Sequence, residues 1–122
     1  MVATLNESPR DTAVLLSEAN GALSREVVPI AAGQTLEAGT VLGKVTSSGE
    51  YVQLDPAATD GSQTAAAVLL YAVETGANPG KATVIVRLAE VSAAALVWPA
   101  GITAAQKDSA VGQLAGAYII AR

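Results

Sequence analysis

The stretch from Leu54 to Leu70 constrains the possible fold more than any other part of the chain. Residues 55–62 contain one proline, two aspartates and one glycine, a composition typical of a tight turn. The chain then runs into nine consecutive apolar residues, from Ala65 to Val73. This run is too short to cross a bilayer, but it fits a strand that is buried on both faces. We therefore expect a small, mainly β domain built around this strand.

The length and composition fit one domain with its own hydrophobic core. The chain has 122 residues, of which 51% are hydrophobic and 15% charged, below a usual charged fraction of about 25%. Much of the apolar content is alanine. A surface that is poor in charge and rich in alanine either faces another protein or belongs to a soluble protein that simply uses alanine. The composition leaves both interpretations open.

Charge and missing residue types exclude several function classes. The formal net charge is −4 and the seven basic residues are scattered, so no basic stripe for nucleic acid forms along the sequence. Cysteine and histidine are absent, which excludes disulfides, histidine-dependent catalytic triads and the usual zinc ligands. No glycine-rich phosphate loop is present. The first residues lack the basic and apolar regions of a secretory signal, and we expect no membrane association.

Residues 1–32 differ from the rest of the chain. They contain two short β-like runs, Thr12–Ser17 and Ser24–Ile30, separated by a turn at Asn20–Gly21. Two such runs are too little to fold alone, so we expect an extended N-terminal arm that pairs with something else. The alternative is a flexible terminus without a role. Residues 33–122 are then the β-rich domain.

Further strands and one helix are predicted in that domain. Residues 40–46 and 50–54 fit a hairpin, and residues 83–91 alternate clearly between apolar and polar side chains. Thr103 with Gln106 fits the capping box of a short C-terminal helix. Gly116 can end that helix, and a last short strand follows it.

Two further features allow a structural or a functional interpretation. Trp98, the only tryptophan, ends an apolar run before Pro99, and it is either a core anchor or a binding residue. Asp55 and Asp60 are interpreted as turn caps rather than as a calcium pair or an acid–base pair. Their segment lacks the oxygen ligands at alternate positions that a calcium loop needs.

Three stretches together resemble the bacteriophage head decoration protein family, of which the lambda head decoration protein is the best-known member. They read AGQTLEAGTVLG at 32–43, DPAATDGSQTAAAVL at 55–69 and LVWPAGIT at 96–103. The resemblance covers roughly residues 12–122, and the second and third stretches are its specific part. The longer N-terminal segment indicates a branch other than that of lambda itself.

The resemblance implies a structural protein with a β-clip fold and no enzymatic activity, cofactor or metal. Family members form homotrimers on the outer surface of the expanded phage head, at three-fold and quasi-three-fold sites. There they bind the major capsid protein and stabilise the head against the pressure of packaged DNA. The protein would be made in the bacterial host cytoplasm and located in the virion.

On this interpretation the apolar residues of the arm contact the capsid, and Trp98 with Pro99 holds the trimer seam or the core. The candidate capsid contacts are Val14, Leu15, Leu16, Val27, Val28 and Ile30. One alternative is a β-clip module that recognises a glycan or peptide. It needs an exposed aromatic platform, for which the chain offers Tyr51, Tyr71, Trp98 and Tyr118. A second alternative is a small enzyme that uses Asp55 and Asp60 as its carboxylates.

Overall fold

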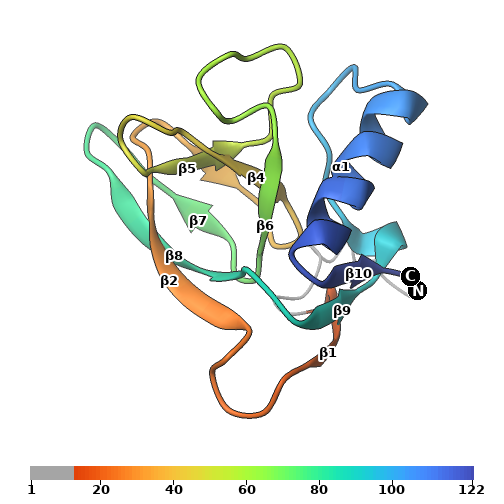
Figure 1. Ribbon diagram of the computed structural model, residues 1–122. Helices are drawn as coiled ribbons and strands as arrows, with labels where there is room; N and C mark the ends of the chain where they lie inside the picture. Colours follow the sequence, from red (N-terminus) through yellow and green to blue (C-terminus); the bar gives the residue numbers. More distant parts are fainter. Residues whose placement is uncertain (1–12) are drawn as a thin grey trace, which may run out of the picture.

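The computed structural model describes residues 13–122, and in this range the protein is mainly β with one helix near the C-terminus (Figure 1). A closed five-stranded barrel forms the larger part of the fold. Its strands, in spatial order, are β2 (Arg25–Ile30), β5 (Tyr51–Gln53), β4 (Val41–Lys44), β6 (Ala65–Leu69) and β8 (Gly80–Ile85). The mainly β fold class predicted from the sequence is confirmed.

The remaining elements extend the barrel on two sides. A three-stranded sheet contains β1 (Leu15–Glu18), β9 (Ala89–Val91) and β10 (Ile119–Ala121), with β9 in the centre. A small ribbon pairs β3 (Thr35–Leu36) with β7 (Val73–Glu74). The 3₁₀ helix η1 (Ala93–Ala95) and the helix α1 (Ala104–Gly116) lie between β9 and β10 in the sequence.

Strand β6 is buried on both faces, as its apolar sequence predicts. Ala67 and Leu69 pack inside the barrel, whereas Ala65 and Val68 pack into a second core between the barrel and α1. The apolar run is longer than the strand. It bends after Leu69 and re-enters a strand only at β7.

The region predicted as one strand over 83–91 is two strands. Strand β8 closes the barrel against β2, and β9 belongs to the three-stranded sheet. Between them Leu88 has a φ of 53°, which turns the chain out of the barrel. Burial does not alternate across this turn, because Leu88 is 41% exposed and Ala89 is buried. The apolar residues Val86 and Leu88 nevertheless continue the sequence pattern, which therefore conceals the break.

Much of the predicted arm lies inside the fold. Strand β2 pairs along its whole length with β8, and β1 pairs with β9. Residues 15–18 and 25–30 therefore find their pairing partners in this chain, which differs from the expectation of an arm that pairs elsewhere. The physical reason is that barrel closure needs β2 between β5 and β8. Residues 1–12 of the predicted arm lie outside the described residues.

The helix begins and ends where the sequence predicts. The backbone N–H of Gln106 donates to Thr103 Oγ1 at 3.1 Å, and the backbone N–H of Thr103 donates to Gln106 Oε1 at 3.0 Å. This capping box satisfies two amides at the helix start. Ala110 and Leu114 are buried against the second core, so α1 covers the side of β6 that faces away from the barrel interior (Figure 1).

Candidate functional site

The three-stranded sheet of β1, β9 and β10, here called the terminal sheet, brings the first and last described strands together. Strand β1 runs antiparallel to β9, and β10 runs parallel to it. Backbone bonds hold the sheet to the segments beside it. The Ser92 amide donates to the Val14 carbonyl at 2.7 Å, and the Ala93 amide donates to the Arg122 carbonyl at 2.9 Å. Residues far apart in sequence therefore form one continuous surface.

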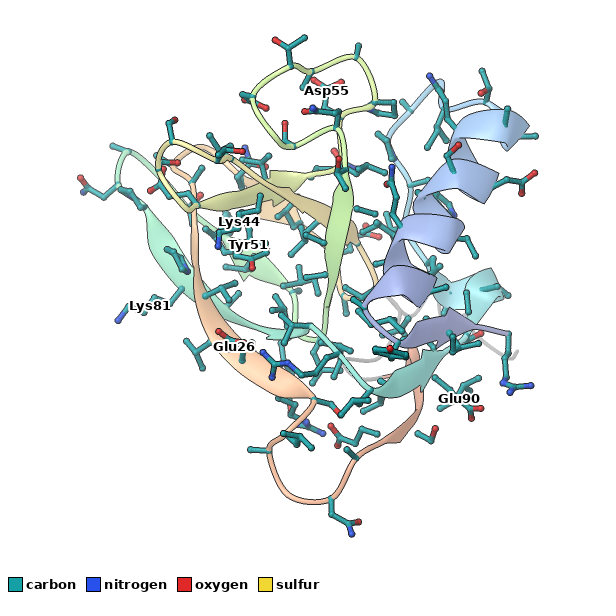
Figure 2. The ribbon with its side chains drawn as sticks, in the orientation of Figure 1. Glu26, Lys44, Tyr51, Asp55, Lys81 and Glu90 are labelled. Carbon is teal, nitrogen blue, oxygen red and sulfur yellow. The ribbon has the colours of Figure 1, made fainter. Side chains whose placement is uncertain are left out.

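Glu90 lies at the centre of the outer face of the terminal sheet, where Figure 2 shows it pointing away from the fold. Its carboxylate accepts a hydrogen bond from Ser17 Oγ at 3.0 Å and pairs with the Arg122 guanidinium at 2.7 Å. The three side chains link all three strands. In the fold Glu90 therefore connects the polar side chains of this face.

Apolar side chains flank this polar row. Leu16 is 54% exposed and Ile120 is 38% exposed. A β-bulge between Leu15 and Ser17 explains Leu16, because the bulge leaves two consecutive residues of β1 facing outward. Ile120 faces outward because its neighbour Ile119 points into the core.

Two more exposed apolar residues lie where β9 and β10 begin. Tyr118 is 69% exposed and Leu88 is 41% exposed, and both have positive φ, 62° and 53°. They are neighbours, since the amide of Ala89 donates to the Tyr118 carbonyl and the strands run parallel from this point. Non-glycine residues in this conformation are disfavoured by roughly 1–2 kcal/mol. The fold therefore holds two large exposed side chains at strained positions.

The structure divides the six predicted capsid contacts. Val14, Val28 and Ile30 are buried in the two cores, and Leu15 packs partly against one of them. Only Leu16 and Val27, which is 64% exposed, are available to a partner. Sequence reasoning missed Tyr118 and Ile120. The alternation of Tyr118, Ile119 and Ile120 carries the signal, because burying the middle residue exposes the outer two.

Trp98 and Pro99 follow an edge contact of the barrel. The Val41 amide donates to the Val97 carbonyl at 3.1 Å, and Trp98 then packs, partly buried, against the second core. Pro99 lines a cavity of about 200 Å³ that also contacts Pro56 and Gln106. Trp98 thus packs partly buried against the second core, and Pro99 lies at a concave surface.

Asp55 and Asp60 act as turn caps in a loop at the far end of the molecule from the terminal sheet (Figures 1 and 2). Asp60 Oδ1 accepts from both the backbone N–H and the hydroxyl of Ser62, at 3.0 and 2.6 Å. These bonds hold the pKa of Asp60 below its usual value. Asp55 Oδ1 accepts from the Ala57 amide at 3.1 Å. The prediction of turn capping is confirmed for both residues.

The proposed aromatic platform is not assembled. Tyr51 packs against the barrel core, with the Lys44 ammonium 5.8 Å from its ring centre. Trp98 packs against the other core, and Tyr71 accepts a long hydrogen bond from Arg25. Tyr71 is 39% exposed and Tyr118 is 69% exposed, so two of the four rings are exposed. No observation favours a glycan or peptide site built on these rings.

Two searches of the described residues concern metal ions and membranes. Within residues 13–122 no three acidic side chains gather closely enough to hold a metal ion. No helix in the same range has the length and hydrophobicity to cross a membrane.

Comparison with known families identifies the chain. Residues 4–119 match the family model described as bacteriophage lambda head decoration protein D. No curated protein sequence gives a significant match. The matched range covers nearly all of the chain, including the barrel, the helix and most of the terminal sheet. The general role of this family is structural decoration of the phage head. The chain belongs to the bacteriophage lambda head decoration protein family.

Proposed function

We propose that the protein is a homotrimer that binds the major capsid protein on the outer surface of the expanded phage head. The sites are the three-fold and quasi-three-fold positions of the shell. Family membership supports the decoration role. The observation that carries the finer proposal is the terminal sheet, where Leu16, Tyr118 and Ile120 expose apolar surface around an ordered polar row.

The terminal sheet is the surface that we assign to the capsid. Exposed apolar side chains grouped on one face are typical of protein interaction sites, and a polar row at the centre fixes orientation. Of the contacts predicted from the sequence, Leu16 remains in this proposal. Leu88, Tyr118 and Ile120 replace the buried residues Val14, Val28 and Ile30.

The seam between subunits is proposed to lie along α1, at a surface other than the terminal sheet. A groove of about 260 Å³ between the helix and the 54–63 loop is lined only by uncharged residues, among them Pro56, Gln106 and Gln113. The cavity at Pro99 shares Pro56 and Gln106 with this groove but is also lined by Asp55, so only the groove itself is without charges. A concave surface without charges avoids the desolvation of ions when a second copy covers it. Three identical seams of this kind close a ring.

Trimerisation explains how weak contacts can hold the shell. Three terminal sheets on one trimer bind as a unit, and the gain in avidity can reach about 10²–10⁴ without new contacts. A protein that binds only the expanded shell stabilises that state by mass action. This is the proposed source of resistance to the pressure of packaged DNA.

The test combines solution mass with capsid binding. Light scattering should give about three times the 12.2 kDa chain mass, and co-sedimentation with expanded, undecorated capsids should saturate. The variant Tyr118→Asp should remain a folded trimer and bind capsids at least tenfold more weakly. Ser47→Asp, which adds the same charge at an exposed position of the turn between β4 and β5, should bind like the parent protein. Equal binding by both variants would refute the assignment of the terminal sheet.

A further inference from the structure

We propose that Asn20 is a site of spontaneous deamidation, in which the backbone nitrogen of Gly21 attacks the asparagine side chain. The inference is independent of the proposed function. It rests on the loop that joins β1 and β2, which projects beyond both sheets (Figure 1).

The base of this loop is fixed. Ser24 is fully buried, and its hydroxyl donates to the Leu88 carbonyl at 2.8 Å and accepts from the Ala19 amide at 2.9 Å. Just outside, the Arg25 guanidinium binds the Glu18 carboxylate through two nitrogens, at 2.9 and 2.8 Å. Residues 20–23 therefore form an exposed tip on a rigid base.

The reacting groups at the tip are free. Across residues 13–122, neither the Asn20 side chain nor the Gly21 amide takes part in a hydrogen bond. A β-carbon built at Gly21 would meet nothing within 4 Å, and its φ is 68°. Water and base therefore reach the amide, and no side chain hinders ring closure. Glycine is also the residue that this backbone conformation favours.

The reaction balances without an oxidant or a metal. The Gly21 nitrogen loses its proton and forms a bond to Asn20 Cγ. The bond from Cγ to the side-chain nitrogen breaks, and ammonia leaves with a proton. Water then opens the five-membered succinimide at one of its two carbonyls, which gives aspartate or isoaspartate. Each product adds one negative charge to a chain whose formal net charge is −4.

The same chain contains two matched controls. Asp60–Gly61 has the same following glycine, but the Gly61 amide donates to Gln63 Oε1 at 2.8 Å and the Asp60 carboxylate is held by Ser62. Asn78–Pro79 lacks the attacking N–H altogether. Sequence alone marks Asn20 and Asp60 as similar, whereas the fold leaves only Asn20 unprotected.

The experiment is incubation of the folded full-length protein at mildly alkaline pH, followed by tryptic peptide mapping. Peptide 11–25 contains Asn20 as its only asparagine, and peptide 45–81 contains both controls. We expect peptide 11–25 to gain the mass difference between an amide and an acid, with a rate that rises with pH. Peptide 45–81 should keep its mass and its elution position.

A second variant keeps the proposal falsifiable. Asn20→Gln should abolish the acidic species seen by ion exchange and leave the unfolding midpoint unchanged, because closing a six-membered ring is slower. If the acidic species persists in this variant, the proposal is wrong. It is also wrong if peptide 11–25 reacts only when the protein is unfolded in urea, since the folded loop would then block the attack.

Discussion

Gly61 packs directly against Thr46, so closely that a β-carbon at position 61 would overlap the threonine hydroxyl and the Lys44 carbonyl. The Thr46 amide donates to the Asp60 carbonyl at 2.9 Å, and the φ of Gly61 is 109°. The far loop is therefore attached to the end of β4 at a point where only glycine fits.

The first prediction follows from this contact. Gly61→Ala should lower the free energy of unfolding by roughly 1–3 kcal/mol, because it adds both backbone strain and overlap. Urea denaturation measures it. Gly112→Ala is the matched control, since that glycine is helical and has open space around its Cα. It should stabilise the protein by about 0.5–1 kcal/mol. Equal effects of the two substitutions would contradict the packing argument.

The Tyr118 side chain should favour capsid binding but lower the unfolding free energy of the isolated protein. Tyr118→Gly relieves a φ of 62° at the end of α1, and the mostly exposed ring loses little packing. We expect the isolated protein to gain on the order of 1 kcal/mol in unfolding free energy. Capsid binding, measured by co-sedimentation, should weaken. A variant that is less stable than the parent would show that the ring contributes more packing than its exposure indicates.

Two leucines offer the same substitution in opposite environments. Leu114→Ala removes a fully buried side chain between α1 and the second core, and should cost about 2–5 kcal/mol. Leu16→Ala removes an exposed side chain, and should change stability by less than about 0.5 kcal/mol while weakening capsid binding. Thermal unfolding and co-sedimentation together separate the two roles. A large stability loss in Leu16→Ala would remove Leu16 from the proposed capsid surface.

The Glu18–Arg25 pair predicts a pH dependence. Hydrogen bonding to Arg25 lowers the pKa of Glu18 from its ordinary value of 4.5. The folded state therefore binds this proton more weakly than the unfolded state does. The stabilising contribution of the ion pair is present above the pKa of Glu18 in the unfolded state and is lost as pH falls through the pKa of Glu18 in the folded state. Because the pair is partly exposed, we expect it to contribute roughly 0.5–1 kcal/mol to the free energy of unfolding.

Urea denaturation of Glu18→Gln and the parent protein tests this sign. The parent should be more stable at neutral pH, and the difference should shrink below pH 4.5. Ser47→Ala, at an exposed position of the turn after β4 and away from the pair, is the control and should leave the pH profile unchanged. A difference that grows on acidification would contradict the prediction.

Several local features were predictable because neighbouring residues create them. The capping box of Thr103 and Gln106, the turn caps of Asp55 and Asp60 and the two-sided burial of β6 all follow from short patterns. The capsid contacts were predictable only in part. Apolar runs of the N-terminal region suggested a partner, but a run does not say whether that partner is another protein or β8 of the same chain.

The sequence by itself determined the mainly β class, the short helix with its start and the absence of histidine and cysteine chemistry, because composition and local hydrogen bonding suffice for these. Its three motif stretches also indicated the family. Only the tertiary structure decided that residues 25–30 close a barrel, that Leu88 lies at the break between two strands, and that Leu16, Tyr118 and Ile120 are exposed. Each of these depends on strand pairs joined across long sequence separations, and the energy of such pairs comes from partners that no local pattern identifies.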